Sequence, residues 1–403
     1  MVRPRNKKGW RLGCWCDKIE AIRLMRIGID AHAAERDGSG NCTYIRNLIQ
    51  SLIRLDGRNQ YILYAINSQH PFYQTLQTKK QVQIKQPPFQ VLKNPLLRIP
   101  LWLGFQTFKD KLDILHVQYI APPFYKGQLV TTIHDLGFLH VPETFSMWEA
   151  FRSKILIRIT ARRSDKIITG SQYSKQDIIR SYCIPHSQVK VIPLGISSHS
   201  APPTNSSETQ KILRKYRIQS LYLLSVGRLN PRKNLSALVK AFSLLKEKIN
   251  LPHKLVITGS QDFNSQKVIR TIKKTPYSRD VLFTGLVSDQ ELWGLYKNAD
   301  IFVYPSLFEG VGLPVLEAMS LGLPVVTSNS SSLKETAGDA AILINPSDPQ
   351  EISQAIERLI TDPALKNTYA EKGKQHSNKF SWSSTARQTL KTYEKTAALY
   401  ESC

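Results

Sequence analysis

The 403-residue chain is poor in acidic side chains, with 31 Asp and Glu residues against 55 Lys and Arg and a formal net charge of +24. A surplus of this size indicates an anionic partner: nucleic acid, anionic lipid headgroups or a phosphorylated substrate. The first half carries most of the surplus, since residues 1–200 hold 29 basic and 13 acidic side chains. We therefore expect the anionic partner to meet that half.

Cysteine is also scarce, because the five residues are scattered and odd in number, which does not suit a disulfide framework. No second Cys or His pair completes a metal site for Cys14 and Cys16. We expect a cytoplasmic protein. Residues 1–24 are basic but lack the apolar core of a signal peptide. We interpret them as either a flexible extension or the product of a start codon assigned too early, and keep them out of the fold prediction.

Long apolar runs are absent as well. A membrane span needs roughly 18 apolar residues, and the best stretch, Leu96 to Phe105, is short and interrupted by Arg98. Hydrophobic residues nevertheless make up 41% of the chain, which provides for sizeable cores and excludes a disordered protein.

From Met25 onward, short apolar runs alternate with amphipathic stretches, a pattern typical of βαβ units around a parallel sheet. The expected strands lie at 27–29, 61–66, 114–117, 129–133, 166–169, 189–192, 222–226, 254–258, 281–283, 301–304, 325–327 and 341–344. The Ser-, Pro- and Asn-containing segment 197–210 is the clearest linker. The sequence thus predicts an α/β protein with two doubly wound Rossmann-like domains, 25–200 and 201–380, and a ligand cleft between them.

The densest signal lies between Tyr304 and Met319, where a strand, a Gly-containing loop and a helix follow one another. Free backbone N–H groups at such a helix N-terminus can bind an anion. Glu309 lies in the loop and Glu317 about one turn into the helix, so both can face one ligand. Because two carboxylates would repel a phosphate, sugar hydroxyls are their natural partners. The alternative is a pair of solvated glutamates on an ordinary crossover.

A second stretch, Ser225 to Asn234, again runs from a strand through a Gly turn and places Arg228 and Lys233 at the carboxyl edge of the sheet. Two cations at this position suit a diphosphate, although a basic surface turn is the alternative. The chain has no Asp-x-Asp pair, so a carboxylate-held Mg²⁺ has no obvious ligands. We expect no metal, and we expect these cations and backbone N–H groups to stabilise a leaving diphosphate.

The first half offers two weaker signals. Gly38-Ser39-Gly40 follows Ile29-Asp30 and precedes a helix, but a plain flexible loop is the simpler interpretation. His134-Asp135 directly follows a strand and therefore lies at the carboxyl edge of the predicted sheet. A single His in this position is more often structural than catalytic.

Together these stretches resemble the family-four retaining glycosyltransferases of GT-B fold, from Met25 to the C-terminus. The N-terminal motifs look most like the mannosyltransferase branch that uses GDP-mannose. The motifs that carry the resemblance are Glu309-x₇-Glu317 with Glu335 to Asp339, Gly227-Arg228 with Lys233-Asn234, Phe283 to Val287, Gly38-Ser39-Gly40, and Thr132 to Leu136.

The resemblance implies a role for each matched residue. Arg228, Lys233 and the Gly40 backbone would hold the donor diphosphate. Glu317 would bind the ribose hydroxyls, and Glu309 the hydroxyls of the transferred sugar. The remaining implied contacts are His134 on the donor sugar, Leu286 and Val287 near the base, and the backbone N–H groups of Gly310, Val311 and Gly312. The catalytic set would be Glu309, His134, Arg228 and Lys233.

The resemblance also implies that the last helix, in 381–403, crosses back to the N-terminal domain. Two stretches depart from the family pattern. Val311 replaces an aromatic residue, which should reshape the sugar pocket slightly, and Asn41-Cys42-Thr43 differs from the usual sequence after the Gly-x-Gly loop, which weakens the assigned phosphate contacts there.

The function expected from this resemblance is transfer of a hexose, foremost mannose from GDP-mannose, to a glycan or lipid-linked saccharide in cell-surface polysaccharide assembly. A UDP-sugar donor is the alternative. A nucleic-acid-binding protein is a distant third, because no reading module or interleaved exposed aromatics accompany the basic residues. Phe151 to Arg163 mixes apolar and cationic residues at helical spacing, which fits either an interfacial helix on the inner membrane face or a core helix with a basic edge.

Overall fold

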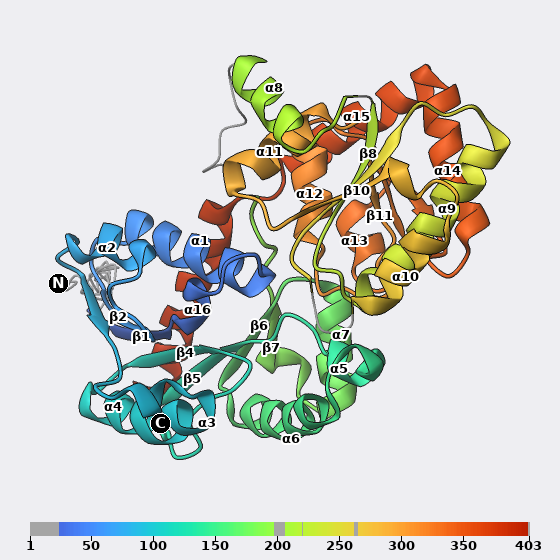
Figure 1. Ribbon diagram of the computed structural model, residues 1–403. Helices are drawn as coiled ribbons and strands as arrows, with labels where there is room; N and C mark the ends of the chain where they lie inside the picture. The colour runs from blue at the N-terminus through green and yellow to red at the C-terminus, as the bar shows by residue number, and fades with distance from the viewer. Residues whose placement is uncertain (1–23, 197–205, 220, 262–264, 402–403) are drawn as a thin grey trace, which may run out of the picture.

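The computed structural model describes residues 24–196, 206–219, 221–261 and 265–401, which form two α/β lobes (Figure 1). Most of the predicted extension 1–24, with Cys14 and Cys16, and most of the predicted linker 197–210 lie outside the described residues. Each lobe is built around one sheet in which every neighbouring pair of strands is parallel.

The N-terminal sheet has seven strands in the order β3-β2-β1-β4-β5-β6-β7. Their bounds are β1 Arg26–Asp30, β2 Gln60–Tyr64, β3 Val82–Lys85, β4 Ile114–Gln118, β5 Gln128–Thr132, β6 Lys166–Thr169 and β7 Val189–Val191. Strand β3 was not predicted. It lies at the sheet edge and alternates apolar and polar residues, so it lacks the continuous apolar run that marks the other strands.

The C-terminal sheet has six strands in the order β10-β9-β8-β11-β12-β13, and a predicted strand matches each of them. Their bounds are β8 Tyr222–Val226, β9 Lys254–Thr258, β10 Val281–Gly285, β11 Ile301–Tyr304, β12 Val325–Ser328 and β13 Ile342–Ile344. In both sheets the strand order reverses beside the first strand, which is the point where ligands of doubly wound sheets bind.

Helices cover both sheets. In the N-terminal lobe they are α1 Gly40–Leu55, α2 Pro71–Gln77, α3 Pro95–Leu97, α4 Gly104–Lys109, α5 Gly137–His140, α6 Met147–Arg163 and α7 Gln172–Tyr182. In the rest of the chain they are α8 Ser206–Lys215, α9 Leu235–Lys248, α10 Gln266–Lys274, α11 Asp289–Asn298, α12 Leu313–Ser320, α13 Leu333–Ala337, α14 Pro349–Thr361, α15 Pro363–Ser377 and α16 Trp382–Glu401. Among the described residues, no helix combines the length and the apolar content that crossing a bilayer requires.

Helix α16, drawn in red, passes through the N-terminal lobe beside α1 (Figure 1). Its path is fixed at the start, where a Cβ on Gly195 would lie 2.1 Å from the Trp382 nitrogen. Further along, the Tyr393 hydroxyl lies 2.5 Å from Nδ1 of the buried His116 on β4. Lys190 on β7 donates to the Thr392 hydroxyl at 2.9 Å. The end of the chain is therefore part of the packing of the N-terminal lobe.

Candidate active site

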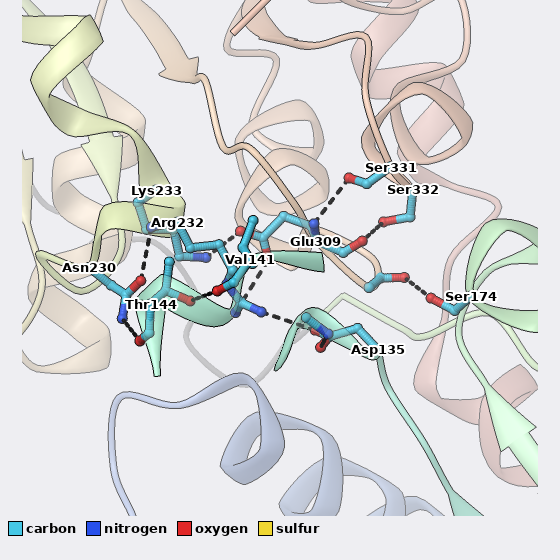
Figure 2. A network of polar contacts seen from close by, with 12 residues as sticks. Asp135, Val141, Thr144, Ser174, Asn230, Arg232, Lys233, Glu309, Ser331 and Ser332 are labelled. Atoms are coloured by element: carbon cyan, nitrogen blue, oxygen red, sulfur yellow. Dashed lines mark hydrogen bonds and ion pairs between the residues drawn. The ribbon is translucent and has the colours of Figure 1, made fainter. Parts of the chain in front are cut away.

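The site lies where the carboxyl ends of β8 and β11 face the segment that follows β5 (Figure 2). After β8 the chain turns through Gly227, whose φ of +153° favours glycine, and a Cβ there would lie 3.2 Å from Cε of Lys233. The Asn230 side chain then caps a 3₁₀ turn, Pro231–Lys233, by accepting from the Arg232 N–H at 2.9 Å. This turn aims Arg232 and Lys233 at the end of the sheet.

The partly buried Lys233 forms a cluster with the buried Tyr304 and Glu309 at this edge. The Lys233 ammonium donates to the Tyr304 hydroxyl at 2.5 Å and to Glu309 Oε1 at 2.6 Å, and the Tyr304 hydroxyl donates to the same carboxylate oxygen at 3.1 Å. An ammonium has three N–H donors, so the cluster leaves one for a further acceptor. Two of the predicted residues, Lys233 and Glu309, are thus direct neighbours.

The Glu309 carboxylate remains ionised at neutral pH. Burial alone would raise its pKa, but Lys233 and Arg232 outweigh that effect and hold the pKa at about 2. Burial lowers the pKa of Lys233, and the carboxylate opposes that shift. The pair is therefore an anion and a cation held together at the end of the sheet.

Arg232 is a site residue that the sequence analysis missed. Its guanidinium donates to Asp135 Oδ2 of the N-terminal lobe at 3.2 Å and lies 3.9 Å from Glu309 Oε2 of the C-terminal lobe. Arg232 thus connects the two lobes (Figure 2). No local pattern predicts this contact, because Asp135 and Arg232 meet only when both lobes are in place.

Arg228 occupies a different environment from Lys233. Its side chain is exposed, and it forms no ion pair with any residue in the described ranges. Since it follows β8 by two residues, it stands at the same sheet edge with an unengaged guanidinium.

The loop after Glu309 is held against the N-terminal lobe. The Gly310 carbonyl accepts hydrogen bonds from the hydroxyls of Ser171 at 2.8 Å and Ser174 at 3.3 Å. A Cβ on Gly310 would come within 2.3 Å of the His134 carbonyl oxygen. Residue 310 must therefore be glycine for the lobes to meet in this way.

The rest of the loop leads into α12. Val311 is buried, and one of its methyl groups fills the space that a Cβ on Gly170 would take, 2.3 Å away. Gly312 precedes the helix with φ +88° and no side-chain cap. The Val311 side chain thus packs toward β6 of the N-terminal lobe, where Gly170 makes room for it.

Glu317 lies on α12 and contacts a second tyrosine. The Tyr296 hydroxyl donates to Glu317 Oε2 at 3.0 Å. Burial raises the pKa of Glu317 to about 7, with a smaller contribution from Asp289 and opposition from the Tyr296 hydrogen bond. Tyr296 and Tyr304 both pack on Phe302, at ring-centroid distances of 5.5 and 5.8 Å. The two glutamates therefore line one region but differ in charge state near neutral pH.

His134 is buried in the N-terminal wall, beside the loop that carries Glu309 and Gly310. Its Nε2 lies 3.0 Å from Gln118 Oε1, and its ring meets the Tyr44 ring edge-on at 4.6 Å. Burial lowers the pKa of His134 to about 4, so the ring is neutral at pH 7.

The Gly38-Ser39-Gly40 loop faces the end of β10, where Leu286 and Val287 were predicted to lie near the nucleotide base. A Cβ on Gly38 would lie 2.9 Å from Cδ1 of the exposed Leu286 in the opposite lobe. Gly40 is the exposed first residue of α1 and has nothing within 4 Å of its Cβ position. Val287 is partly buried against the apolar core. Gly38, two residues before Gly40, thus lies against Leu286 of the opposite lobe.

Few side chains in the described part of this region are available to bind a metal ion. In the ranges that the structure describes, no group of three or more His, Cys, Asp or Glu side chains is arranged to hold an ion. Asp135 and Glu309 each already face a cation, Arg232 or Lys233.

Comparison with known families accounts for this arrangement. Residues 39–199 match the profile described as Glycosyltransferase Family 4, and residues 208–376 match Glycosyl transferases group 1. The O-antigen chain mannosyltransferase B of Escherichia coli is 31% identical over 281 residues, which cover 68% of this chain and 74% of that protein. The chain belongs to the family-four GT-B glycosyltransferases, in the mannosyltransferase branch.

Other relatives support the assignment to this family, and they match this chain over different shares of their own length. The serotype-specific mannosyltransferase WbdA of Escherichia coli is 32% identical over 270 residues, covering 66% of this chain but 33% of WbdA. The chain therefore spans about a third of that relative and about three quarters of the first one.

Solved structures confirm the GT-B fold of this glycosyltransferase. The sucrose-phosphate synthase of Thermosynechococcus elongatus superposes with a TM-score of 0.75 at 19% identity, over 94% of this chain and 100% of that one. Anabaena Alr3699/HepE, solved with UDP and glucose, gives a TM-score of 0.70 at 19% identity over 92% and 100%. The predicted α/β fold class, with two doubly wound parallel sheets, is confirmed.

Proposed function

We propose that this glycosyltransferase moves mannose from GDP-mannose to a saccharide or lipid-linked saccharide, with retention of the anomeric configuration and without a metal. The observation that carries the proposal is the ionised Glu309 paired with Lys233 at the end of β11, beside a free guanidinium of Arg228. A cation pair for a diphosphate and a carboxylate for sugar hydroxyls thus lie at the carboxyl ends of β8 and β11. The mannose donor is favoured because relatives at 31% and 32% identity are mannosyltransferases.

The chemistry follows from where charge develops. As the glycosidic bond of the donor breaks, negative charge builds on the departing diphosphate, and the Lys233 ammonium, the Arg228 guanidinium and the N-terminus of α12 stabilise it. The N–H of Lys233 that the cluster does not use suits a phosphate oxygen. These groups supply the electrophilic role that a metal ion plays in other sites.

Retention requires attack from the face that the leaving group vacates or a covalent intermediate. Glu309 is a poor nucleophile here because Lys233 and Tyr304 both donate to its Oε1. We assign it instead to the hydroxyls of the transferred sugar. In our proposal the acceptor hydroxyl attacks from the front face, and the departing phosphate oxygen takes its proton. In this proposal the neutral His134 ring contacts the donor sugar.

Glu317 completes the donor site by accepting from ribose hydroxyls. Leu286 and Val287 would lie beside the base, and the backbone at Gly40, Gly310, Val311 and Gly312 would contact the phosphates and sugar. A UDP-sugar is the second candidate donor, since a protein of the same fold, Anabaena Alr3699/HepE, was solved with UDP and glucose.

We also propose that the enzyme is cytoplasmic and works at an anionic membrane surface in cell-surface polysaccharide assembly. The relatives named as O-antigen chain enzymes support this setting. The surplus of basic side chains in residues 1–200 supports an anionic surface beside that lobe.

The test is a thermal-shift panel of GDP-mannose, UDP-glucose, UDP-N-acetylglucosamine and ADP-glucose, each with and without EDTA. The proposal predicts a rise in Tm with GDP-mannose alone that EDTA does not change. A rise with a UDP-sugar alone would overturn the donor, and a rise abolished by EDTA would overturn the metal-free site.

A further inference from the structure

Gln118 ends strand β4 at the carboxyl edge of the N-terminal sheet. It pairs in register with Thr132, the last residue of β5, so Gln118 and His134 lie close to the ends of neighbouring strands. Strand β4 also borders β1, where the strand order reverses. Ligands of doubly wound sheets bind beside the strand ends at such a reversal. Gln118 therefore occupies a position at which a substrate is expected.

The amide of Gln118 is buried but only half engaged. The residue is 6% exposed, and its Oε1 lies 3.0 Å from His134 Nε2. Its Nε2 is buried as well and meets no hydrogen-bond acceptor in the described part of the chain. A buried N–H group without a partner is destabilising, and native structures keep few of them. An oxygen atom of a bound ligand would give this amide the acceptor that it lacks.

The backbone after Gln118 is held in a rare conformation. Tyr119 has φ +65°, and the Ile120 N–H donates across it to the Gln118 carbonyl at 2.8 Å. A three-residue turn with positive φ at a residue other than glycine is strained, and such strain is concentrated at functional sites. The Tyr119 N–H still donates to the Thr132 carbonyl at 3.0 Å. The strain therefore lies where the chain turns sharply while Gln118 stays in the sheet.

Two tyrosine rings keep the His134 ring beside the Gln118 amide. Tyr44 of α1 meets it edge-on at 4.6 Å, and Tyr119 meets it at 5.8 Å. The Tyr44 hydroxyl is held in turn, 2.9 Å from Thr132 Oγ1. The imidazole and the amide are thus fixed relative to each other before any ligand arrives, which is the condition for preorganised binding.

This pair borders the loop of the opposite lobe that carries Glu309. A Cβ on Gly310 would lie 2.3 Å from the His134 carbonyl oxygen. Burial keeps the His134 ring neutral at pH 7, and the adjacent Asp135 is bonded to Arg232. An amide N–H beside a neutral ring suits an uncharged acceptor, so a sugar hydroxyl fits here better than a phosphate.

We infer that Gln118 binds a hydroxyl group of the transferred hexose through its amide Nε2, beside His134, and thereby contributes to the choice of sugar. This inference rests on the proposed function, because the transferred hexose is assigned to this wall through His134. Gln118 is then a specificity-determining residue of the N-terminal lobe, and no motif of the sequence marks it.

The test uses GDP-mannose and analogues that each lack one hydroxyl of the hexose. In the wild type, the analogue without the hydroxyl that Gln118 binds should lose at least about tenfold in kcat/KM, because the amide stays unpaired. Gln118→Met removes the amide at a similar side-chain length. Its kcat/KM with GDP-mannose should fall by a similar factor, and its discrimination against that analogue should disappear.

A purely structural role gives a different pattern. If Gln118 only supports the His134 ring, Gln118→Met should slow every donor by the same factor and keep the wild-type discrimination against each analogue. That result would overturn the inference. Gln118→Asn, which keeps an amide on a shorter side chain, covers the case in which the methionine variant does not fold. It should lose the same discrimination, and a wild-type pattern in this variant would also overturn the inference.

Gln128→Met is the matched control. Gln128 is a buried glutamine that also has an amide atom without a partner among the described residues, but it begins β5 at the opposite edge of the sheet. We expect this variant to discriminate among the analogues as the wild type does. A loss of discrimination equal to that of Gln118→Met would mean that the effect is not specific to Gln118 and would contradict the inference.

Binding measurements separate this inference from the donor proposal. GDP alone should raise the Tm of Gln118→Met as much as that of the wild type, whereas GDP-mannose should raise it less than in the wild type. A smaller shift with GDP alone would place the effect on the nucleotide and overturn the inference. If only a UDP-sugar shifts the wild type, the donor proposal fails, and the same comparison with analogues of that sugar decides the role of Gln118.

Discussion

At the residue scale, Arg228 and Lys233 carry the same charge beside the same strand end but differ in their surroundings. Lys233 is partly buried and paired with Glu309, whereas Arg228 is exposed and unpaired among the described residues. Removing a buried partner leaves an uncompensated charge, and removing an exposed cation does not. Substitutions at these two residues therefore distinguish an effect on donor binding alone from an effect on both binding and stability.

Arg228→Ala should weaken donor binding at least about tenfold while changing the free energy of unfolding by less than about 0.5 kcal/mol. Lys233→Ala should abolish product formation and lower the free energy of unfolding by about 2–4 kcal/mol, because Glu309 loses its nearest cation. Urea denaturation and donor titration measure the two effects, and the double variant should show no turnover. Wild-type turnover in the double variant would remove both residues from the mechanism.

Glu317 gives the site a pH dependence near neutrality. Its pKa of about 7 in the folded protein exceeds its ordinary value of 4.5. The ionised carboxylate is the better acceptor for ribose hydroxyls, so kcat/KM for the donor should fall as pH drops below about 7. Glu317→Gln should lower kcat/KM and lose this acid limb. A Glu317→Gln profile that keeps the limb would assign it to another group.

The raised pKa of Glu317 affects the stability of the protein in the opposite direction, because it favours the folded state at low pH. A carboxyl group with a raised pKa in the folded state favours folding when protonated, so its contribution is lost as pH rises from about 4.5 to 7. Glu317→Gln should therefore be more stable than the wild type at pH 8, by about 1–3 kcal/mol. Chemical denaturation at pH 5 and pH 8 checks the sign, and a variant less stable at pH 8 would contradict it.

At the element scale, the strands of both sheets were largely predictable, because buried parallel strands are short apolar runs. The turn after β8 and the loop before α12 were also predictable, since Gly227 and Gly312 mark the places where positive φ is needed. The edge strand β3 was not, because its apolar and polar residues alternate and none of them is fully buried. Nor was the exposure of α6 fixed by its residues, since the same pattern suits a core helix.

The loop before α12 is the element whose packing is most sensitive to substitution. Gly310→Ala would place a methyl group 2.3 Å from the His134 carbonyl oxygen, so the lobes must separate at this point. We expect kcat to fall at least about a hundredfold with little change in the far-ultraviolet circular dichroism. Gly57→Ala, at an exposed position outside the site where nothing lies within 4 Å, is the matched control. Equal activity in both variants would refute the close approach.

Helix α16 makes a second test of element packing. Tyr393→Phe removes the hydroxyl that meets the buried His116 Nδ1 and should lower the free energy of unfolding by about 1–3 kcal/mol. Thermal and urea unfolding measure the loss. Stability equal to that of the wild type would show that α16 is not fixed to β4 through this hydrogen bond.

At the scale of the whole molecule, the site exists only because the two lobes meet. Sequence patterns could assign Lys233 and Glu309 to one edge, since both follow strands of the same sheet. They could not assign Arg232, whose partner Asp135 lies 97 positions earlier in the other lobe. The seam between the lobes is also where Gly310 and Val311 pack, against His134 and Gly170.

The hydrogen bond between Arg232 and Asp135 predicts that the two lobes are energetically coupled. Arg232→Ala and Asp135→Asn should each lower kcat/KM, and the double variant should cost less than the sum of the two, because either change breaks the same contact. Steady-state kinetics in a double-mutant cycle provides the measurement. Strictly additive losses would mean that the two residues act separately.

The most direct test of the proposed activity is nucleoside diphosphate release from each candidate donor, with mannoside acceptors and EDTA present. The account predicts GDP release from GDP-mannose, a product with the donor's anomeric configuration by proton NMR, and loss of both in the Arg228→Ala/Lys233→Ala variant. Release only from a UDP-sugar, inversion at the anomeric carbon, or a requirement for added Mg²⁺ would contradict it.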